Sequence, residues 1–185
     1  MVACEKSPVQ PVSGVPGAIH PPMSYLNLND TAVVFGRAAG FDLDGNGSND
    51  VYFATQLVGD PVMQQDKKQW LAGGAFTTFF PINTTESIPV MRSPDDIPIN
   101  SFNGYNWYNA PEIVLTQKII SINIPPYWSG DWTETDHRFI PLQLNKSNAL
   151  YNGWVEVSFN KQNEKLIVHR AAICKEPNKA IKAGK

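Results

Sequence analysis

The chain has 185 residues, a length sufficient for one domain with its own hydrophobic core. Its formal net charge of −2 argues against a nucleic-acid-binding protein, which needs a strongly basic surface. Charged residues make up only 17% of it, below the roughly 25% of an average domain, whereas 15 prolines and 13 glycines favour turns and strands over long helices. No run approaches the roughly 18 apolar residues of a membrane-spanning helix.

The N-terminal segment MVACEKS resembles the end of a bacterial lipoprotein signal, in which small residues precede a cysteine that becomes lipidated. Cys4 would be that cysteine, with Ala3 directly before it, although Met1 stands where leucine is more usual. The basic and apolar parts of such a signal are absent, so we expect the sequence to begin near the processing site. The alternatives are an ordinary tail cysteine and a disulfide with Cys174, between which sequence does not decide.

Residues 1–22 are expected to form a proline-rich tether, and residues 23–174 a folded domain. Short apolar runs recur through the domain between turn residues. These runs are TAVVFGRAAGFDL, VYFATQLV, AFTTFFPI, EIVLTQKIISINI, RFIPLQL, GWVEVSFN and KLIVHRAAI. Only residues 60–73 show a helical pattern, and we find no internal repeat. The sequence therefore predicts an all-β fold, a single antiparallel β-sandwich with one short helix at most.

A β-hairpin is the clearest prediction near the C-terminus, where KQNE joins GWVEVSFN to KLIVHRAAI. Val155, Val157 and Phe159 occupy alternate positions in the first strand, which indicates that one face of this strand is apolar. The basic run over residues 175–185 is expected to be a solvated tail.

The DLDGNG loop, the strand RFIPLQL, and the segments YNGWVEVSF and KLIVHRAAI together resemble a group of secreted or lipid-anchored bacterial β-sandwich proteins. That group carries an LDxDGxxD loop near its start and a GW-V-x-hydrophobic hairpin near its end. Here LIVHRAAI keeps His169 but lacks the tyrosines of the group's TIHDYAY-like strand. Because the function of the group is largely unknown, the resemblance implies a fold and a location in the cell envelope rather than an activity.

The segment FDLDGNGSNDVY, residues 41–52, spaces its acids as calcium loops do. Calcium prefers six to eight oxygen ligands, which side chains at loop positions 1, 3, 5 and 9 and a backbone carbonyl at position 7 can provide. Gly47 at position 6 permits a sharp turn. The spacing resembles the calcium loops between strands of integrin propeller blades and departs from the EF-hand at position 12, which is Phe53. The expected calcium ligands are Asp42, Asp44, Asn46, Ser48 and Asp50.

Two explanations of this acidic loop remain open. Carboxylates crowded into nine residues repel one another unless a cation, protons or solvent relieves them, which favours a metal. Asp, Asn and Gly are also the residues that tight turns select without any metal. We expect a structural calcium ion that pins two strands, with an affinity as weak as about 10⁻⁴ to 10⁻³ M, the range of extracellular modules.

Two aromatic stretches, residues 102–112 and 125–137, are candidates for a carbohydrate-binding platform in which rings stack on sugars and nearby amides and carboxylates bind hydroxyl groups. The alternative is that these rings fill the core or anchor loops, which large aromatic side chains do equally well. Trp70 and Trp154 lie in more regular patterns and are expected in the core. The candidate ligand-binding residues are Tyr105, Trp107, Tyr108, Tyr127, Trp128 and Trp132.

Nucleophilic catalysis has no sequence motif here, since GxSxG is absent and neither cysteine has a plausible histidine partner nearby in sequence. His137 lies in a polar stretch with Asp136 and Glu134, where a solvated loop is the simpler explanation. A glycosidase pair of carboxylates would be placed only by the fold.

The leading hypothesis is a non-catalytic outer-membrane lipoprotein that faces the cell surface or the periplasm. In this hypothesis its calcium-stabilised β-sandwich contacts other cell-envelope proteins, and a lipid on Cys4 is its only link to the membrane. The runner-up is a carbohydrate-binding accessory module that uses the aromatic stretches, and a hydrolase is third. The fold alone does not distinguish these functions, because function depends on a site.

Overall fold

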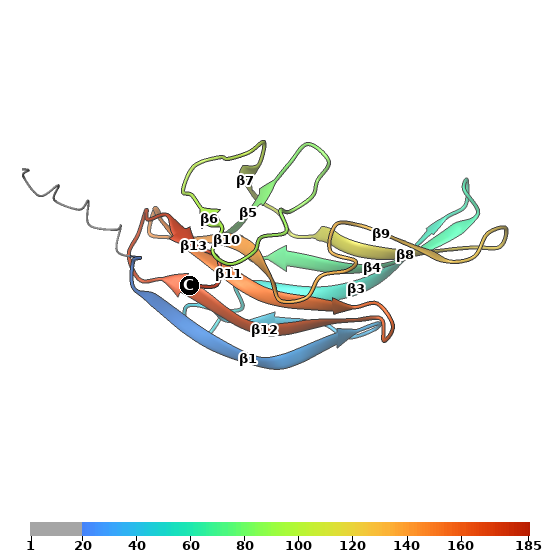
Figure 1. The fold of residues 1–185 in the computed structure, drawn as a ribbon, viewed down its shortest axis with the longest axis horizontal. Helices are drawn as coiled ribbons and strands as arrows, with labels where there is room; N and C mark the ends of the chain where they lie inside the picture. Colours follow the sequence, from blue (N-terminus) through green and yellow to red (C-terminus); the bar gives the residue numbers. More distant parts are fainter. Residues whose placement is uncertain (1–19) are drawn as a thin grey trace, which may run out of the picture.

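The computed structural model describes residues 20–185, and every regular element within them is a β-strand (Figure 1). The predicted all-β fold with antiparallel sheets is confirmed. No helix in this range is long and apolar enough to cross a membrane. The strands are β1 (Met23–Val34), β2 (Ala39–Phe41), β3 (Val51–Asp60), β4 (Gln65–Gly74), β5 (Thr78–Ile82), β6 (Asp96–Ile97), β7 (Asn106–Asn109), β8 (Ile113–Ser121), β9 (Tyr127–Ser129), β10 (Arg138–Lys146), β11 (Ala149–Asn160), β12 (Lys165–Cys174) and β13 (Ile181–Lys182).

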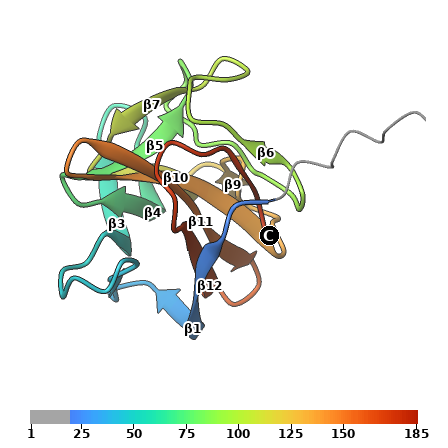
Figure 2. The ribbon, with the colours of Figure 1, turned by 90° about the vertical axis from the view of Figure 1, so that its left-hand side faces the viewer.

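Two antiparallel sheets form the layers of a sandwich (Figure 2). The six-stranded sheet has the order β1–β12–β11–β10–β5–β7, and the five-stranded sheet has the order β2–β3–β4–β8–β9. Their inner faces share one hydrophobic core. Trp70 of β4 lies at its centre, with ring centroids 5.2 Å from Phe159 of β11 and 5.5 Å from Trp128 of β9. Burial of these large rings is a main source of the stability of the sandwich.

The predicted C-terminal hairpin is β11–β12, whose pairing extends from Asn160–Lys165 to Gly153–Ile173 with one register shift between Glu156 and Val157. Val155, Val157 and Phe159 point into the main core, as their alternation predicted. On the opposite face of β11, Trp154 is buried in a second hydrophobic cluster. The buried residues of this second cluster are Met23, Met91, Ile97, Phe139, Trp154, Ala172, Cys174, Ile181 and Ala183.

Residues 175–180 are exposed, but Ile181 and Ala183 belong to that second cluster, so the expectation of a solvated tail is wrong for the end of the chain. β13 pairs with β6 over the outer face of the six-stranded sheet, and Ile181 and Ala183 are 2% and 0% exposed. Trp154 Nε1 donates a hydrogen bond to the carbonyl oxygen of Lys185. The exposed Lys182 lies between the buried Ile181 and Ala183, so this short strand buries one side and keeps its charge in solvent.

Residues 60–73, the one segment with a helical pattern in the sequence, form no helix. β3 ends at Asp60, residues 61–64 form a turn, and β4 follows as a strand. β4 pairs with β3 on one side and with β8 on the other, so its backbone groups are bonded on both edges. This pairing and the burial of Trp70 override the weak helical preference of the sequence.

Cys4 and residues 1–19 as a whole lie outside the described residues, so lipidation of Cys4 stays a prediction. The alternative, a disulfide between Cys4 and Cys174, also involves a residue outside the described range and stays a prediction. Cys174 itself is buried at the end of β12, and desolvation raises the pKa of its thiol.

Candidate metal site

The acidic loop connects β2 to β3 at one end of the five-stranded sheet. Phe41 pairs with Val51, and the backbone N–H of Asp50 donates to the carbonyl oxygen of Phe41 at 2.9 Å, which closes the base of the loop. Leu43 is 2% exposed and packs in the main core. An apolar anchor between two acids therefore fixes the start of the loop while its tip stays in solvent.

Asp42 organises the tip of the loop through its carboxylate. Oδ1 accepts hydrogen bonds from the backbone N–H groups of Asp44, Gly45 and Asn46, and Oδ2 accepts one from Gly47 at 2.7 Å. These bonds favour the charged form, so the pKa of Asp42 is lowered, with the Gly47 bond as the largest cause. Positive φ angles of 77° and 88° at Gly45 and Gly47 let the chain wrap around the carboxylate.

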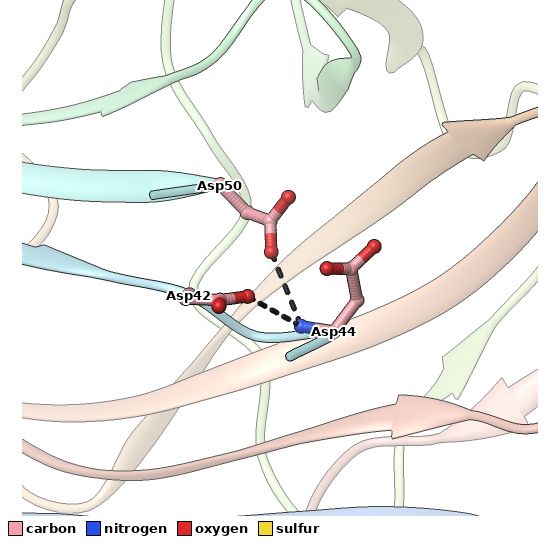
Figure 3. A group of neighbouring side chains, drawn as sticks. All are labelled: Asp42, Asp44 and Asp50. Atoms are coloured by element: carbon pink, nitrogen blue, oxygen red, sulfur yellow. Dashed lines mark hydrogen bonds between the residues drawn. The ribbon is translucent and has the colours of Figure 1, made fainter. Parts of the chain in front are cut away.

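Asp50 lies in the opposite environment because its side chain is buried beneath the loop. Its Oδ2 accepts a hydrogen bond from the N–H group of Leu43 at 2.7 Å. The same oxygen accepts one from the N–H group of Asp44 at 3.2 Å (Figure 3). Burial nevertheless raises the pKa of Asp50, and the nearby charges of Asp44 and Asp42 raise it further. The loop thus holds one carboxylate whose charge is favoured and one whose charge is opposed.

The carboxylates of Asp42, Asp44 and Asp50 converge, and one oxygen from each lies within 4.8 Å of the others (Figure 3). Two oxygens on opposite sides of a calcium ion are about 4.6 to 5.2 Å apart, since each Ca–O distance is about 2.3 to 2.6 Å. Lys146 of β10 adds an ammonium 3.0 Å from Asp44 Oδ2. The three carboxylates and this lysine carry a formal charge of −2, which one Ca²⁺ would cancel. The donor set and its spacing fit this ion.

The other two expected ligands occupy the same loop but are exposed. Asn46 Oδ1 accepts a hydrogen bond of 2.8 Å from the N–H of Ser48, so this amide oxygen has a partner within the loop. The structure therefore brings together Asp42, Asp44 and Asp50, and it leaves the roles of Asn46 and Ser48 as predictions.

The aromatic candidates do not form one platform. Trp132 is 1% exposed and donates from Nε1 to the carbonyl oxygen of Ile88, so its expected role in stacking on a ligand is wrong. Trp128 packs against Trp70 and Phe159 beside the main core. Both tryptophans thus pack toward the main core, because burial of a large apolar ring lowers the free energy of the folded state.

The remaining aromatic candidates lie in two separate places. Trp107 packs against the second cluster with its Nε1 bonded to the carbonyl oxygen of Asn100, and Tyr105 is partly buried near it. Tyr108 of β7 and Tyr127 of β9 are 53% and 43% exposed, but they belong to different sheets. No shared surface of these rings follows from their positions.

Lys146 is the residue of the candidate site that sequence reasoning missed. It lies about a hundred residues after the loop, in a strand of the other sheet. From the sequence, a lysine near the end of a predicted strand is expected to be exposed to solvent and to have no particular role. Only the packing of β10 beside the acidic loop gives it a role.

Comparison with known proteins adds nothing to this geometry, because no family model, no curated protein and no solved structure matches the chain. The resemblance to secreted bacterial β-sandwich proteins therefore stays a prediction.

Proposed function

We propose that this chain is a calcium-binding β-sandwich module of the bacterial cell envelope. The observation that carries the proposal is the convergence of Asp42, Asp44 and Asp50 within 4.8 Å. The ion would be structural: it would neutralise the buried charge of Asp50 and hold the loop closed over the core. Weak calcium sites of this kind suit the calcium-rich outside of a cell.

The position of the loop explains why such an ion would stabilise more than the loop itself. Asp50 begins the connection to β3, and its carbonyl oxygen accepts bonds from Ala75 N and from Thr78 Oγ1 at the start of β5. Asp44 contacts Lys146 of β10. The loop thus touches both sheets, and an ion there would resist their separation.

Thermal unfolding with calcium and with a chelator tests the proposal. We expect calcium to raise the melting temperature of the wild-type chain, because an ion that binds only the folded state stabilises it by mass action. Asp44→Ala should abolish the calcium response. Asp131→Ala removes an exposed aspartate elsewhere and should leave the response intact. Equal melting temperatures of the wild-type protein in calcium and in chelator would reject the calcium site.

The proposed location and partners have their own tests. In the native organism, incorporation of a palmitate analogue should depend on Cys4, and Cys4→Ala should lose it. Affinity purification from envelope fractions in calcium and in chelator should recover other envelope proteins with the wild-type chain in calcium. Recovery of the chain alone in both buffers would count against a contact function. Binding to a glycan array that Tyr108→Ala or Tyr127→Ala removes would instead support the carbohydrate-binding alternative.

A further inference from the structure

Far from the acidic loop, side chains from three neighbouring strands form a line of hydrogen bonds. Ser158 Oγ of β11 lies 2.8 Å from His169 Nε2 of β12, and His169 Nδ1 lies 2.6 Å from Asp30 Oδ1 of β1. A nucleophile, a base and a carboxylate that orients the base have this arrangement in acyl-transfer enzymes of unrelated folds. We propose that Ser158 is an activated nucleophile, with His169 as its general base and Asp30 as the residue that positions the imidazole.

Irregular backbone on two strands produces this alignment. The β11–β12 register shifts between Glu156 and Val157, so that His169 is the extra residue of a β-bulge. The β1–β12 register shifts between Asn27 and Thr31, and Asp30 there has a φ of 49°. Bulges redirect side chains, and non-glycine residues with positive φ cost energy unless the surroundings hold them. Both irregularities lie where the imidazole meets its carboxylate.

The hydrogen bonds define which nitrogen of His169 acts as the base. A carboxylate only accepts, so Asp30 holds the proton of His169 on Nδ1 and leaves the lone pair on Nε2 facing Ser158. Ser158 Oγ also accepts a bond of 2.8 Å from the backbone N–H of His137, which stabilises negative charge on Oγ as its proton leaves. The serine hydroxyl has one proton, which it donates either to His169 Nε2 or to Asp136 Oδ1 at 3.0 Å.

Neighbouring side chains hold the imidazole in place. The ring of His137 stacks on that of His169, with centroids 4.3 Å apart and planes 20° apart. His137 Nδ1 is 2.7 Å from the buried Glu156, which is also bonded to Arg170. The base is therefore fixed by Asp30 at one edge and by a stacked ring on one face, which gives the orientation that general-base catalysis needs.

The serine and the histidine stand between two cavities. Ser158 and Asp136 line one of about 340 Å³, together with Lys161. Asp30, His169 and Arg170 line the other, of about 630 Å³. A small acyl group can approach Oγ from the first cavity. Lys161 lines the same cavity and forms an exposed ion pair with Glu134, so an ammonium is available there to a developing oxyanion.

The chemistry that these groups support is hydrolysis of a small uncharged ester. Oγ of Ser158 bonds to the carbonyl carbon as its proton passes to His169 Nε2, and the alcohol then leaves with that proton. Water attacks the acyl-serine, gives a proton to Nε2 and releases the acid, after which the proton returns to Oγ. The carboxylate of Asp136, 3.0 Å from Oγ, would repel an anionic substrate, which is why an uncharged ester is expected.

The test uses the full chain, a fluorophosphonate probe and p-nitrophenyl acetate. We expect one probe adduct per chain, mapped to Ser158, and release of p-nitrophenol above the buffer rate. Ser158→Ala should lose both, whereas Ser101→Ala, at an exposed serine, should keep both. His169→Ala should slow labelling about 100-fold or more, the usual contribution of a general base, and added imidazole should restore part of the rate.

Asp30→Asn separates positioning from a merely structural role. It should slow labelling while the melting temperature and circular dichroism spectrum stay unchanged, since the Asp30 side chain is largely exposed. Absence of an adduct on the folded wild-type chain would overturn the proposal. An adduct that persists at an equal rate in Ser158→Ala would overturn it too. Neither result bears on the calcium site, which is tested by melting.

Discussion

Lys146 Nζ lies 3.0 Å from Asp44 Oδ2, so a strand of the six-stranded sheet supplies a cation to the acidic loop of the other sheet. The Asp44 side chain is only 8% exposed, whereas that of Lys146 is 36% exposed. The ammonium thus occupies a position beside a carboxylate that a calcium ion would also approach. Lysine and calcium would share the charge of the loop or compete for it.

Lys146→Met is expected to strengthen calcium binding and to weaken the calcium-free protein. Removal of the ammonium leaves three carboxylates without a nearby cation, and a partly exposed ion pair is worth up to about 1 kcal/mol, or about fivefold in affinity. Calcium titration by calorimetry and melting in chelator measure the two effects. Lys179→Met, which changes an exposed lysine paired with Glu176, is the matched control and should change neither. Weaker calcium binding in Lys146→Met would show that the lysine supports the ion.

Asp42→Asn and Asp50→Asn are expected to have opposite effects on stability in chelator. Asp42 is charged and accepts four backbone N–H bonds, so loss of its charge should lower the melting temperature. Asp50 is buried near two other acids, so loss of its charge should raise the melting temperature. The asparagine oxygen can still accept the hydrogen bond from the N–H of Leu43. Both variants should respond less to calcium than the wild-type chain does. Destabilisation by both in chelator would contradict the assigned environments.

The pH dependence of stability in chelator follows from the same two acids. The lowered pKa of Asp42 gives stability that is present above its ordinary value of 3.8 and is lost as pH falls through the lower folded pKa. The raised pKa of Asp50 means that stability falls as pH rises from 3.8 through the higher folded pKa. In Asp50→Asn, the stability should therefore no longer fall as pH rises above 3.8 toward neutral pH. Urea unfolding between pH 3 and pH 7 measures the difference from the wild-type chain.

Glu164 is expected to link the two sheets through charge. It lies in the turn after β11 and bonds Lys118 of β8 at 2.5 Å and Lys68 of β4 at 2.6 Å. These bonds lower the pKa of Glu164, with Lys118 as the larger cause, so the link stabilises above its ordinary value of 4.5 and is lost as pH falls through the lower folded pKa. Glu164→Gln should cost about 1 kcal/mol at neutral pH and little in acid. Urea unfolding at both pH values checks this, and an equal cost at both would indicate packing rather than charge.

Ile181→Ala is expected to destabilise the whole domain, because Ile181 and Ala183 are part of its packing. Ile181 is 2% exposed in the second cluster, where loss of a buried side chain costs about 2 to 5 kcal/mol. Lys182→Ala changes the exposed neighbour, which contacts Asp96, and should cost less than about 1 kcal/mol. Chemical denaturation followed by tryptophan fluorescence reports the effect, since Trp154 lies in this cluster. Equal stability of both variants would show that the segment detaches without cost.

Trp132→Ala and Tyr127→Ala are expected to separate the core from the surface within one aromatic stretch. Trp132 is buried, so its truncation should cost about 3 to 5 kcal/mol. Tyr127 is exposed and its truncation should change stability by less than about 0.5 kcal/mol. Thermal melting distinguishes these outcomes. A small effect of Trp132→Ala would show that the loop opens readily and would restore the ring as a ligand candidate.

Local patterns in the sequence determined the strand content, the C-terminal hairpin and the acidic loop. The alternation of Val155, Val157 and Phe159 has the period of a strand, and the spacing of Asp42, Asp44 and Asp50 lies within nine residues. Such features depend on side chains that are neighbours along the chain. They can therefore be predicted from the sequence before the fold is known.

Only the tertiary structure decided the rest, because it depends on pairing between distant strands. Residues 60–73 form a turn and a strand because β4 pairs with β3 on one edge and with β8 on the other. Ile181 is buried because β13 pairs with β6. The contact of His169 with Asp30 spans 139 residues and exists only through a bulge in each strand pairing. Register and burial set these contacts, and neither is encoded in a local period.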